Sequence, residues 1–331
     1  MRIQTDVTRL LGIDLPVIQA GMSWASSGAA LPLAVSQAGG LGVIAAGPMR
    51  EANLAAALDA VRAGTDRPYA VNLPLYRKGA DEIIALLLRC RVPVLIASQG
   101  GPQRYLAAFK EAGTVCLHVV ASVEHARKAA AAGVDGLVVV GGEAGGHPPA
   151  ALVSSLVMLR AVARALPGVP LVASGGFADG AGLAAALALG AGAAQFGTRF
   201  MATPEAGVHQ AYKDAVLRAG TEDTRTVGVG IGMIRALANP FTDRMMALEG
   251  AGAPLAERQA AFAASTLRAA SVEGDVMEGK LEAGQSAGLI DAIEPAGLLV
   301  RRIAAEYLAA VLALPMDRDA ACAPMPMAAK Q

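Results

Sequence analysis

His147 is the histidine whose surroundings are best suited to proton transfer. It lies in residues 141–149, Gly-Gly-Glu-Ala-Gly-Gly-His-Pro-Pro, where the glycines and prolines predict a loop. Imidazole is the side chain best suited to acid and base work near neutral pH. His118, His125 and His209 fall instead within predicted strands or helices. His147 is therefore the candidate catalytic residue, and a surface histidine without function is the alternative.

Two glycine-containing segments could bind a phosphate group. Residues 174–180 read Ser-Gly-Gly-Phe-Ala-Asp-Gly and lead into a predicted helix, and residues 195–200 read Gln-Phe-Gly-Thr-Arg-Phe. Glycines let backbone amides approach a phosphate, and the start of a helix adds partial positive charge. Glycine turns that serve only the fold are the alternative explanation.

Uncharged side chains at two further strand ends suit a heteroaromatic ring. Residues 19–24 read Gln-Ala-Gly-Met-Ser-Trp, and Asn72 ends the third predicted strand. Amides and main-chain groups can hydrogen-bond to such a ring, and Trp24 either covers the pocket or simply packs. The glycine run 228–232 follows no predicted strand and lacks an acidic partner, so a Rossmann dinucleotide site is not indicated.

Composition limits the classes of protein that fit. The chain has 331 residues, 28 basic and 28 acidic side chains and 54% hydrophobic residues, which predicts a large buried core and no nucleic-acid partner. Residues 15–49 carry no charge, but prolines and glycines interrupt them, so no membrane span is expected. Three widely spaced cysteines indicate neither a disulfide framework nor a metal site. Without a secretory signal, a cytoplasmic location is expected.

Eight short apolar runs alternate with segments of helical period. Because these runs are apolar on both faces, they predict parallel strands that are buried on both sides. A doubly wound sheet is the alternative, but the regular spacing favours closure into a (β/α)8 TIM barrel. The active site of such a barrel lies at the carboxyl ends of the strands, where the segments described above would meet. The predicted strands are residues 16–20, 41–45, 69–73, 93–98, 115–119, 136–140, 170–174 and 193–197.

The regular alternation stops after the eighth strand. Residues 205–274 predict a helical lid insertion, with helices at 210–219, 235–248 and 255–270 and no convincing strand. The barrel then comprises residues 1–204 and 275–314. Residues 315–331, rich in proline and methionine and without an apolar period, predict a flexible tail.

Several motifs, in order along the chain, resemble the nitronate monooxygenases, formerly called 2-nitropropane dioxygenases. They are residues 16–22, 72–74, 143–147, 173–180, 195–200 and 284–290. The resemblance implies one non-covalent FMN and oxidation of a small molecule, an alkyl nitronate, by O₂. The same superfamily includes a flavin-dependent enoyl-ACP reductase and NADH:quinone reductases, so an NAD(P)H-dependent reductase is one alternative. A non-catalytic flavin-binding module is another.

The resemblance also implies roles for single residues. His147 is the catalytic histidine, and Gln195 precedes the phosphate-binding residues. The implied FMN phosphate ligands are Ser174, Gly175, Gly176, Gly197 and Thr198, the residues lining the isoalloxazine are Gln19, Gly21, Met22 and Asn72, and Gln285 closes over the flavin. Two positions depart from the family pattern: Gly141, where glutamine is frequent, and Val119, where several members have lysine.

Overall fold

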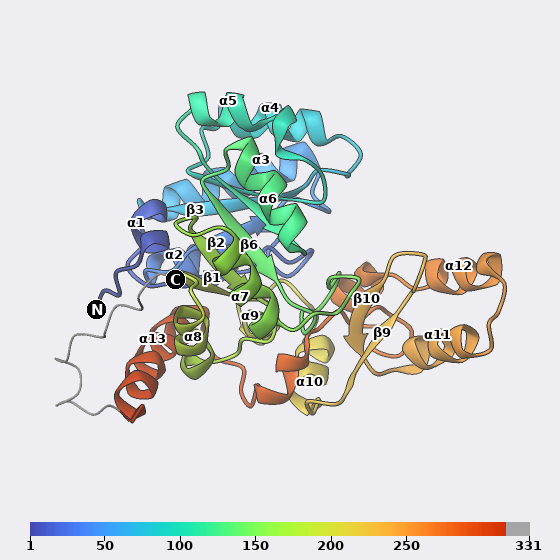
Figure 1. The fold of residues 1–331 in the computed structure, drawn as a ribbon. Helices are drawn as coiled ribbons and strands as arrows, with labels where there is room; N and C mark the ends of the chain where they lie inside the picture. The colour runs from blue at the N-terminus through green and yellow to red at the C-terminus, as the bar shows by residue number, and fades with distance from the viewer. Residues whose placement is uncertain (316–331) are drawn as a thin grey trace, which may run out of the picture.

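Eight parallel strands form a closed barrel (Figure 1). The computed structural model describes residues 1–315, so nearly all of the predicted tail lies outside the described residues. The sheet order is β1-β8-β7-β6-β5-β4-β3-β2, and a parallel bridge between Ile18 and Leu41 joins the two ends. The predicted (β/α)8 barrel is therefore confirmed. The strands are β1 (Val17–Gln19), β2 (Gly42–Ala45), β3 (Tyr69–Pro74), β4 (Val94–Ser98), β5 (Val115–Val120), β6 (Gly136–Val140), β7 (Leu171–Ser174) and β8 (Ala193–Phe196).

Branched apolar side chains fill the inside of the barrel. Each strand contributes inward residues such as Val43, Ile96 and Val172, while its other face packs against the surrounding helices. The short helix α1 (Asp6–Leu11) adds Val7 and Leu11 to the same inner cluster and so closes the amino-terminal end of the barrel. The site is therefore expected at the opposite end of the barrel, where the carboxyl ends of the strands lie.

Helices surround the strands in the expected alternation. The last barrel position is taken by α13 (Ala296–Ala313), which packs against α8 and α2. The helices α13 and α8 pack closely at Gly180. A Cβ added at this glycine would lie only 2.2 Å from the backbone nitrogen of Tyr307, so a larger residue would not fit. The other helices are α2 (Ala30–Gln37), α3 (Glu51–Gly64), α4 (Ala80–Arg89), α5 (Leu106–Glu111), α6 (Val123–Ala132), α7 (Ser155–Ala165) and α8 (Gly180–Ala188).

The insertion lies between β8 and α13 and corrects one prediction. After the short helix α9 (Thr198–Met201), it contains α10 (Gln210–Arg218), α11 (Pro240–Gly250) and α12 (Leu255–Ala264), but also an antiparallel hairpin of β9 (Thr224–Val227) and β10 (Ile234–Leu237). The sequence predicted no strand here and placed Arg235 at the start of a helix. The hairpin forms because Val227 and Ile234 pack on Phe241 of α11, in a small core separate from that of the barrel.

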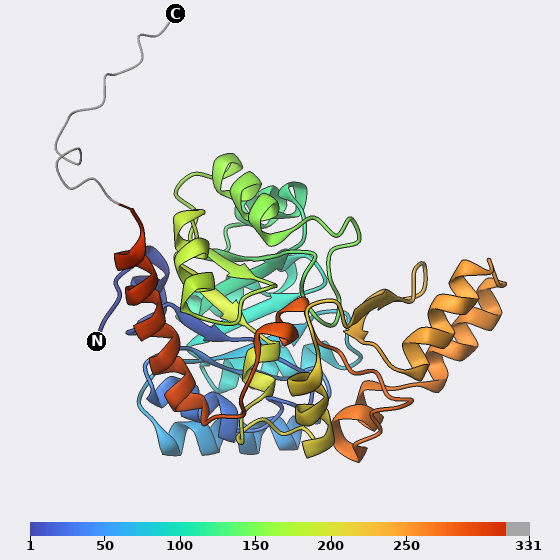
Figure 2. The ribbon, with the colours of Figure 1, turned by 90° about the horizontal axis from the view of Figure 1, so that it is seen from below.

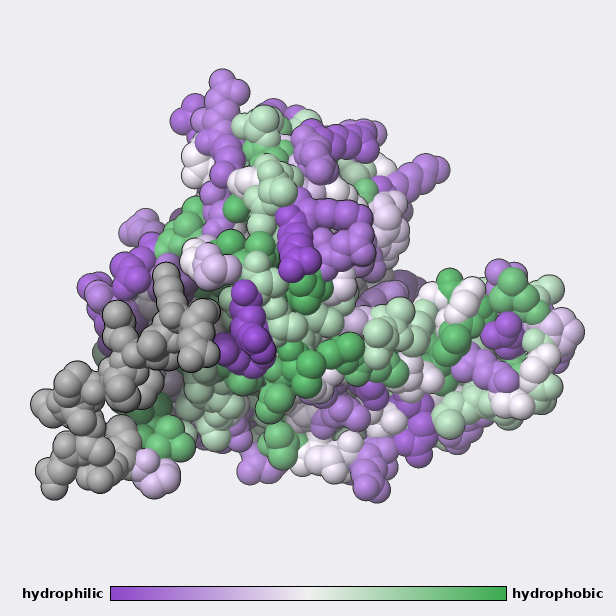
Figure 3. Space-filling model, viewed as in Figure 1, coloured by the Kyte–Doolittle hydropathy of each residue, from purple (hydrophilic) through white to green (hydrophobic). Residues whose placement is uncertain are grey.

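The outer helices of the insertion project away from the barrel. Figures 1 and 2 show α11 and α12 extending to one side, and α12 has no buried residue. Figure 3 shows a mixed polar and apolar surface on this arm. Met246 on α11 and Leu255 on α12 are among its exposed apolar residues. Among residues 1–315, no helix combines the length and apolar character needed to cross a membrane.

Candidate active site

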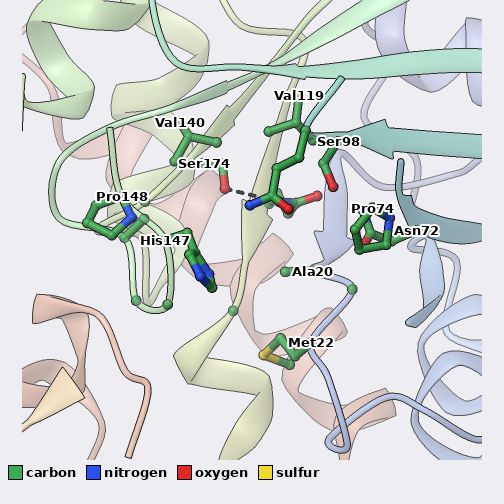
Figure 4. Close-up of a pocket in the computed structure, with 18 of the residues that line it drawn as sticks. Ala20, Met22, Asn72, Pro74, Ser98, Val119, Val140, His147, Pro148 and Ser174 are labelled. Atoms are coloured by element: carbon green, nitrogen blue, oxygen red, sulfur yellow. Dashed lines mark hydrogen bonds between the residues drawn. The ribbon is translucent and has the colours of Figure 1, made fainter. Parts of the chain in front are cut away.

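A cavity of about 1020 Å³ lies at the carboxyl ends of the strands (Figure 4). Turns that follow seven of the strands line it, together with parts of the insertion. Most residues singled out in the sequence meet here although they are far apart in the chain. The predicted residues in its lining are Gly21, Met22, Asn72, His147, Ser174, Gly175, Gly176, Gln195, Gly197 and Thr198.

Gln19 and Gln285 do not line the cavity. The side chain of Gln19 is buried and connects β1 to β2, since its Nε2 donates to the carbonyl of Val43 at 3.1 Å and its Oε1 accepts from the Val43 N–H at 2.9 Å. Gln285 is exposed, and its backbone N–H donates to the carbonyl of Glu143 at 3.0 Å. Trp24 also lies outside the lining. The structure thus gives Gln19 a role in the barrel framework.

The turns after β7 and β8 present free backbone donors to the cavity. Gly175 and Gly176 have φ values of +97° and +83°, which favour glycine. Within residues 1–315, no acceptor pairs with the backbone N–H groups of Gly175, Gly176, Gly197 or Thr198. Buried or half-buried amides rarely remain without a partner, so four such donors suit the oxygens of a phosphate group.

The side chain of Ser174 is fixed beside these donors. Its hydroxyl accepts a hydrogen bond from Gln195 Nε2 at 3.0 Å, drawn as the dashed line in Figure 4. Both residues lie at the ends of neighbouring strands, β7 and β8, whose register pairs Ser174 with Gln195. The parallel pairing itself therefore places the two residues implied by the resemblance side by side.

A tight approach between two strand ends forms the opposite wall. A Cβ added at Gly21 would lie 2.4 Å from Asn72 Cβ, so only glycine lets the β1 turn pass this close. Asn72 Nδ2 donates to the carbonyl of Ile96 at 3.1 Å, which fixes the amide. Together with Met22, this wall combines a polar edge with an apolar surface, as an aromatic ring system requires.

The insertion holds the loop that carries His147. Arg235 on β10 and Gly146 exchange two backbone hydrogen bonds. The Arg235 N–H donates to the carbonyl of Gly146 at 2.7 Å, and the Gly146 N–H donates to the carbonyl of Arg235 at 3.1 Å. The buried guanidinium donates to the carbonyl of Gly142 at 2.9 Å, and burial lowers the pKa of this side chain. His147 itself is exposed to the cavity (Figure 4). The loop is therefore anchored at two residues that precede a histidine exposed to the cavity.

Glu143 connects this loop to the glycine turn after β7. Its carboxylate accepts from the Ser155 N–H at 2.9 Å at the start of α7. The Ser155 hydroxyl lies 2.9 Å from Glu143 Oε2 and 2.7 Å from the carbonyl of Gly175. Gly141 belongs to this arrangement, because a Cβ there would lie 2.0 Å from Ser155 Oγ. Glycine at position 141, which departs from the family pattern, thus allows close packing of the loop against Ser155. Val119, the other departure from that pattern, lies in the cavity wall.

Sequence reasoning missed several residues of the lining. Tyr212 comes from α10 of the insertion, and Glu282 comes from the segment after it. His118, which the sequence placed within the fifth strand as a core or pocket-wall residue, lies in β5 and also lines the cavity. Burial raises the pKa of Glu282 against the opposing effects of His147 and Lys280, and burial lowers the pKa of His118. Tyr105 Oη lies 3.1 Å from His118 Nδ1, so the His118 ring has a hydrogen-bond partner within the cavity wall. Within residues 1–315, no group of His, Cys, Asp or Glu side chains is arranged to hold a metal ion.

Known proteins share this chain's sequence and fold. Residues 4–306 match the sequence profile of the nitronate monooxygenase family. The chain is 36% identical to the (3aS,4S,5R,7aS)-5-hydroxy-7a-methyl-1-oxo-octahydro-1H-indene-4-carboxyl-CoA dehydrogenase of Mycobacterium tuberculosis, over 92% of this chain and 96% of the relative.

Two solved structures are similar over nearly the whole chain. FabK from Thermotoga maritima is 39% identical, with a TM-score of 0.88 over 94% of this chain and 98% of the other. The nitroalkane oxidase from Streptomyces ansochromogenes is 31% identical, with a TM-score of 0.82 over 94% of this chain and 100% of the other. The chain therefore belongs to the nitronate monooxygenase family, whose members are flavin-dependent oxidoreductases.

Proposed function

We propose that this chain binds FMN in the cavity and oxidises alkyl nitronates and their parent nitroalkanes with O₂. The observation that carries the proposal is the set of free backbone N–H groups at Gly175, Gly176, Gly197 and Thr198. These donors would hold the FMN phosphate. Gly21, Met22 and Asn72 would lie along the flavin ring.

The protein groups supply binding and proton transfer around the cofactor. FMN, when bound, would supply the electron transfer from the substrate to O₂. An imidazole nitrogen of His147 takes the α-proton of a neutral nitroalkane, whereas a nitronate has already lost that proton. Pro148 disfavours a helical backbone at His147, and Arg235 anchors the preceding Gly146, which together would hold the imidazole at the cavity. Val119 and Val140 contribute apolar side chains to the wall of the same cavity.

A second candidate is dehydrogenation of a coenzyme A thioester. The cavity volume of about 1020 Å³ is at the upper end for ligand pockets and leaves room beyond a flavin and a small nitronate. Its outer part is lined by Tyr76, Gln99 and Lys128, and Lys128 also pairs with Glu124 at 2.6 Å. The name of the mycobacterial relative supports this candidate as well.

The identity of the cofactor can be measured directly. We expect the purified protein to be yellow and to release FMN on denaturation, because the free amides suit a terminal phosphate. Chromatography of the supernatant after heat denaturation distinguishes FMN from FAD. FAD, or the absence of any flavin after reconstitution with FMN, would contradict the proposal.

Anaerobic mixing separates the candidate reactions. We expect propyl nitronate to bleach the absorbance of the oxidised flavin, because without O₂ the reduced flavin is not reoxidised. Parallel samples receive NADH, NADPH or the hydroxy-indene carboxyl-CoA thioester named for the mycobacterial relative. Bleaching by NAD(P)H without bleaching by the nitronate would favour a reductase, and bleaching by the thioester alone would favour the second candidate.

A further inference from the structure

The direction of the peptide groups in the turn after β7 decides what this turn can bind. Gly175 and Gly176 line the cavity, and within residues 1–315 their backbone N–H groups have no acceptor. Both peptide bonds are trans. In a planar trans peptide the carbonyl and the N–H point in opposite directions. The groups that bind the carbonyls of Ser174 and Gly175 therefore determine where the N–H groups of Gly175 and Gly176 point.

Both carbonyls are bound by groups that lie outside the cavity lining. The Gly141 N–H donates to the carbonyl of Ser174 at 2.9 Å. The Ser155 hydroxyl lies 2.7 Å from the carbonyl oxygen of Gly175 and 3.3 Å from that of Ser174. Ser155 is buried, and neither Ser155 nor Gly141 lines the cavity. Because these contacts hold the carbonyls away from the cavity, they direct the N–H groups of Gly175 and Gly176 toward it.

Ser155 is itself held at the start of α7. Its backbone N–H donates to the two carboxylate oxygens of Glu143 at 2.9 and 3.0 Å, and its hydroxyl lies 2.9 Å from Glu143 Oε2. A Cβ added at Gly141 would lie 2.0 Å from Ser155 Oγ, so the glycine leaves the space that the hydroxyl fills. The hydroxyl has a single proton, and the Gly175 carbonyl is the nearest of the acceptors around it.

The peptide between the two glycines needs such a contact to keep its direction. Gly175 and Gly176 have positive φ values, and neither has a Cβ that would restrict rotation of the peptide group between them. A rotation would turn the Gly175 carbonyl oxygen into the cavity in place of the Gly176 N–H. That oxygen would repel a phosphate oxygen, because both atoms carry negative charge. The Ser155 hydroxyl opposes this rotation by binding the carbonyl oxygen.

We propose that Ser155 is a positioning residue for the cofactor. Its hydroxyl holds the Gly175 carbonyl so that the Gly176 N–H is presented to the phosphate group of a flavin. This role rests on the binding of FMN proposed above. It also implies a selectivity between flavins, because riboflavin, which has no phosphate, gains nothing from the direction of this N–H.

Binding of FMN and of riboflavin to the protein stripped of flavin tests the role of Ser155. We expect Ser155→Ala to weaken FMN binding roughly tenfold or more, the effect of losing one hydrogen bond to a charged group, and to change riboflavin binding by less than about twofold. Ser155→Cys keeps the size of the side chain but has a weak donor, so it should behave like the alanine variant. Quenching of flavin fluorescence measures both dissociation constants. If Ser155→Ala does not fold, Ser155→Cys decides the result.

The neighbouring Ser154 provides a matched control. It is the N-cap of α7, its hydroxyl accepts from the Val157 N–H at 3.4 Å, and it does not line the cavity. Ser154→Ala should lower the unfolding temperature, because the helix loses its cap, and should keep the wild-type ratio of FMN to riboflavin affinity. Equal weakening of both flavins in Ser155→Ala would indicate general damage to the site and would overturn the proposal.

The same titrations separate the role of Ser155 from the function on which it rests. If wild type binds FMN no more tightly than riboflavin, the chain has no phosphate site, and the proposed function fails together with the role of Ser155. If wild type prefers FMN and Ser155→Ala keeps that preference in full, the phosphate site stands and only the role of Ser155 is wrong.

Discussion

Replacing His147 with alanine is expected to lower turnover of a neutral nitroalkane by roughly 10²–10⁴-fold, the range for a lost general acid or base. The protein should keep its flavin, because His147 lies outside the glycine turns with the free donors. The loss should be much smaller for the corresponding nitronate, which arrives without the α-proton. Steady-state kinetics with nitroethane and ethyl nitronate, normalised to flavin content, measures the difference.

His125 provides a matched control for this experiment. It is another histidine of the cavity lining, at the start of α6, and no step of the proposed reaction involves it. His125→Ala should therefore keep wild-type turnover of both substrates. If His147→Ala also oxidises the neutral nitroalkane at the wild-type rate, His147 is only a loop residue and the proton acceptor lies elsewhere.

Gly176→Asp is expected to abolish retention of the flavin. The new carboxylate would stand beside the free amides and repel the phosphate, and two charges 4 Å apart interact by about 4 kcal/mol near a protein surface. It would also crowd Glu143, whose Cβ lies 3.3 Å from the position of an added Cβ. We expect binding of FMN to weaken by at least about 100-fold, as measured by titration of the apoprotein.

Gly168→Asp separates the loss of the site from simple backbone strain. Gly168 has a φ of +84°, almost equal to the +83° of Gly176, but an added Cβ there meets nothing within 4 Å and the residue does not line the cavity. This variant should pay the same conformational cost and still bind FMN. Full flavin retention by Gly176→Asp would mean that the phosphate binds at another place.

The sequence by itself determined the barrel and much of its functional rim. Strands such as β4 and β6 are continuous apolar runs, and local composition alone indicates that they are buried on both faces. Once eight such strands are recognised, the rule that parallel strands end at one rim brings His147, Ser174 and Gly197 together. These predictions succeed because they depend on short-range periodicity and on a general property of the fold.

Only the tertiary structure decided how the rim is completed. The contact between Arg235 and Gly142 joins residues 93 positions apart, and the hairpin that carries Arg235 is stabilised by the small core around Phe241. Glu282 has no feature in the sequence that distinguishes it from a surface glutamate. Gln19 is the last residue of the apolar strand β1, where a pocket residue could lie, yet its side-chain amide pairs with the backbone of Val43 on β2. Such roles depend on which distant backbone groups a side chain meets, and local sequence patterns do not encode those distances.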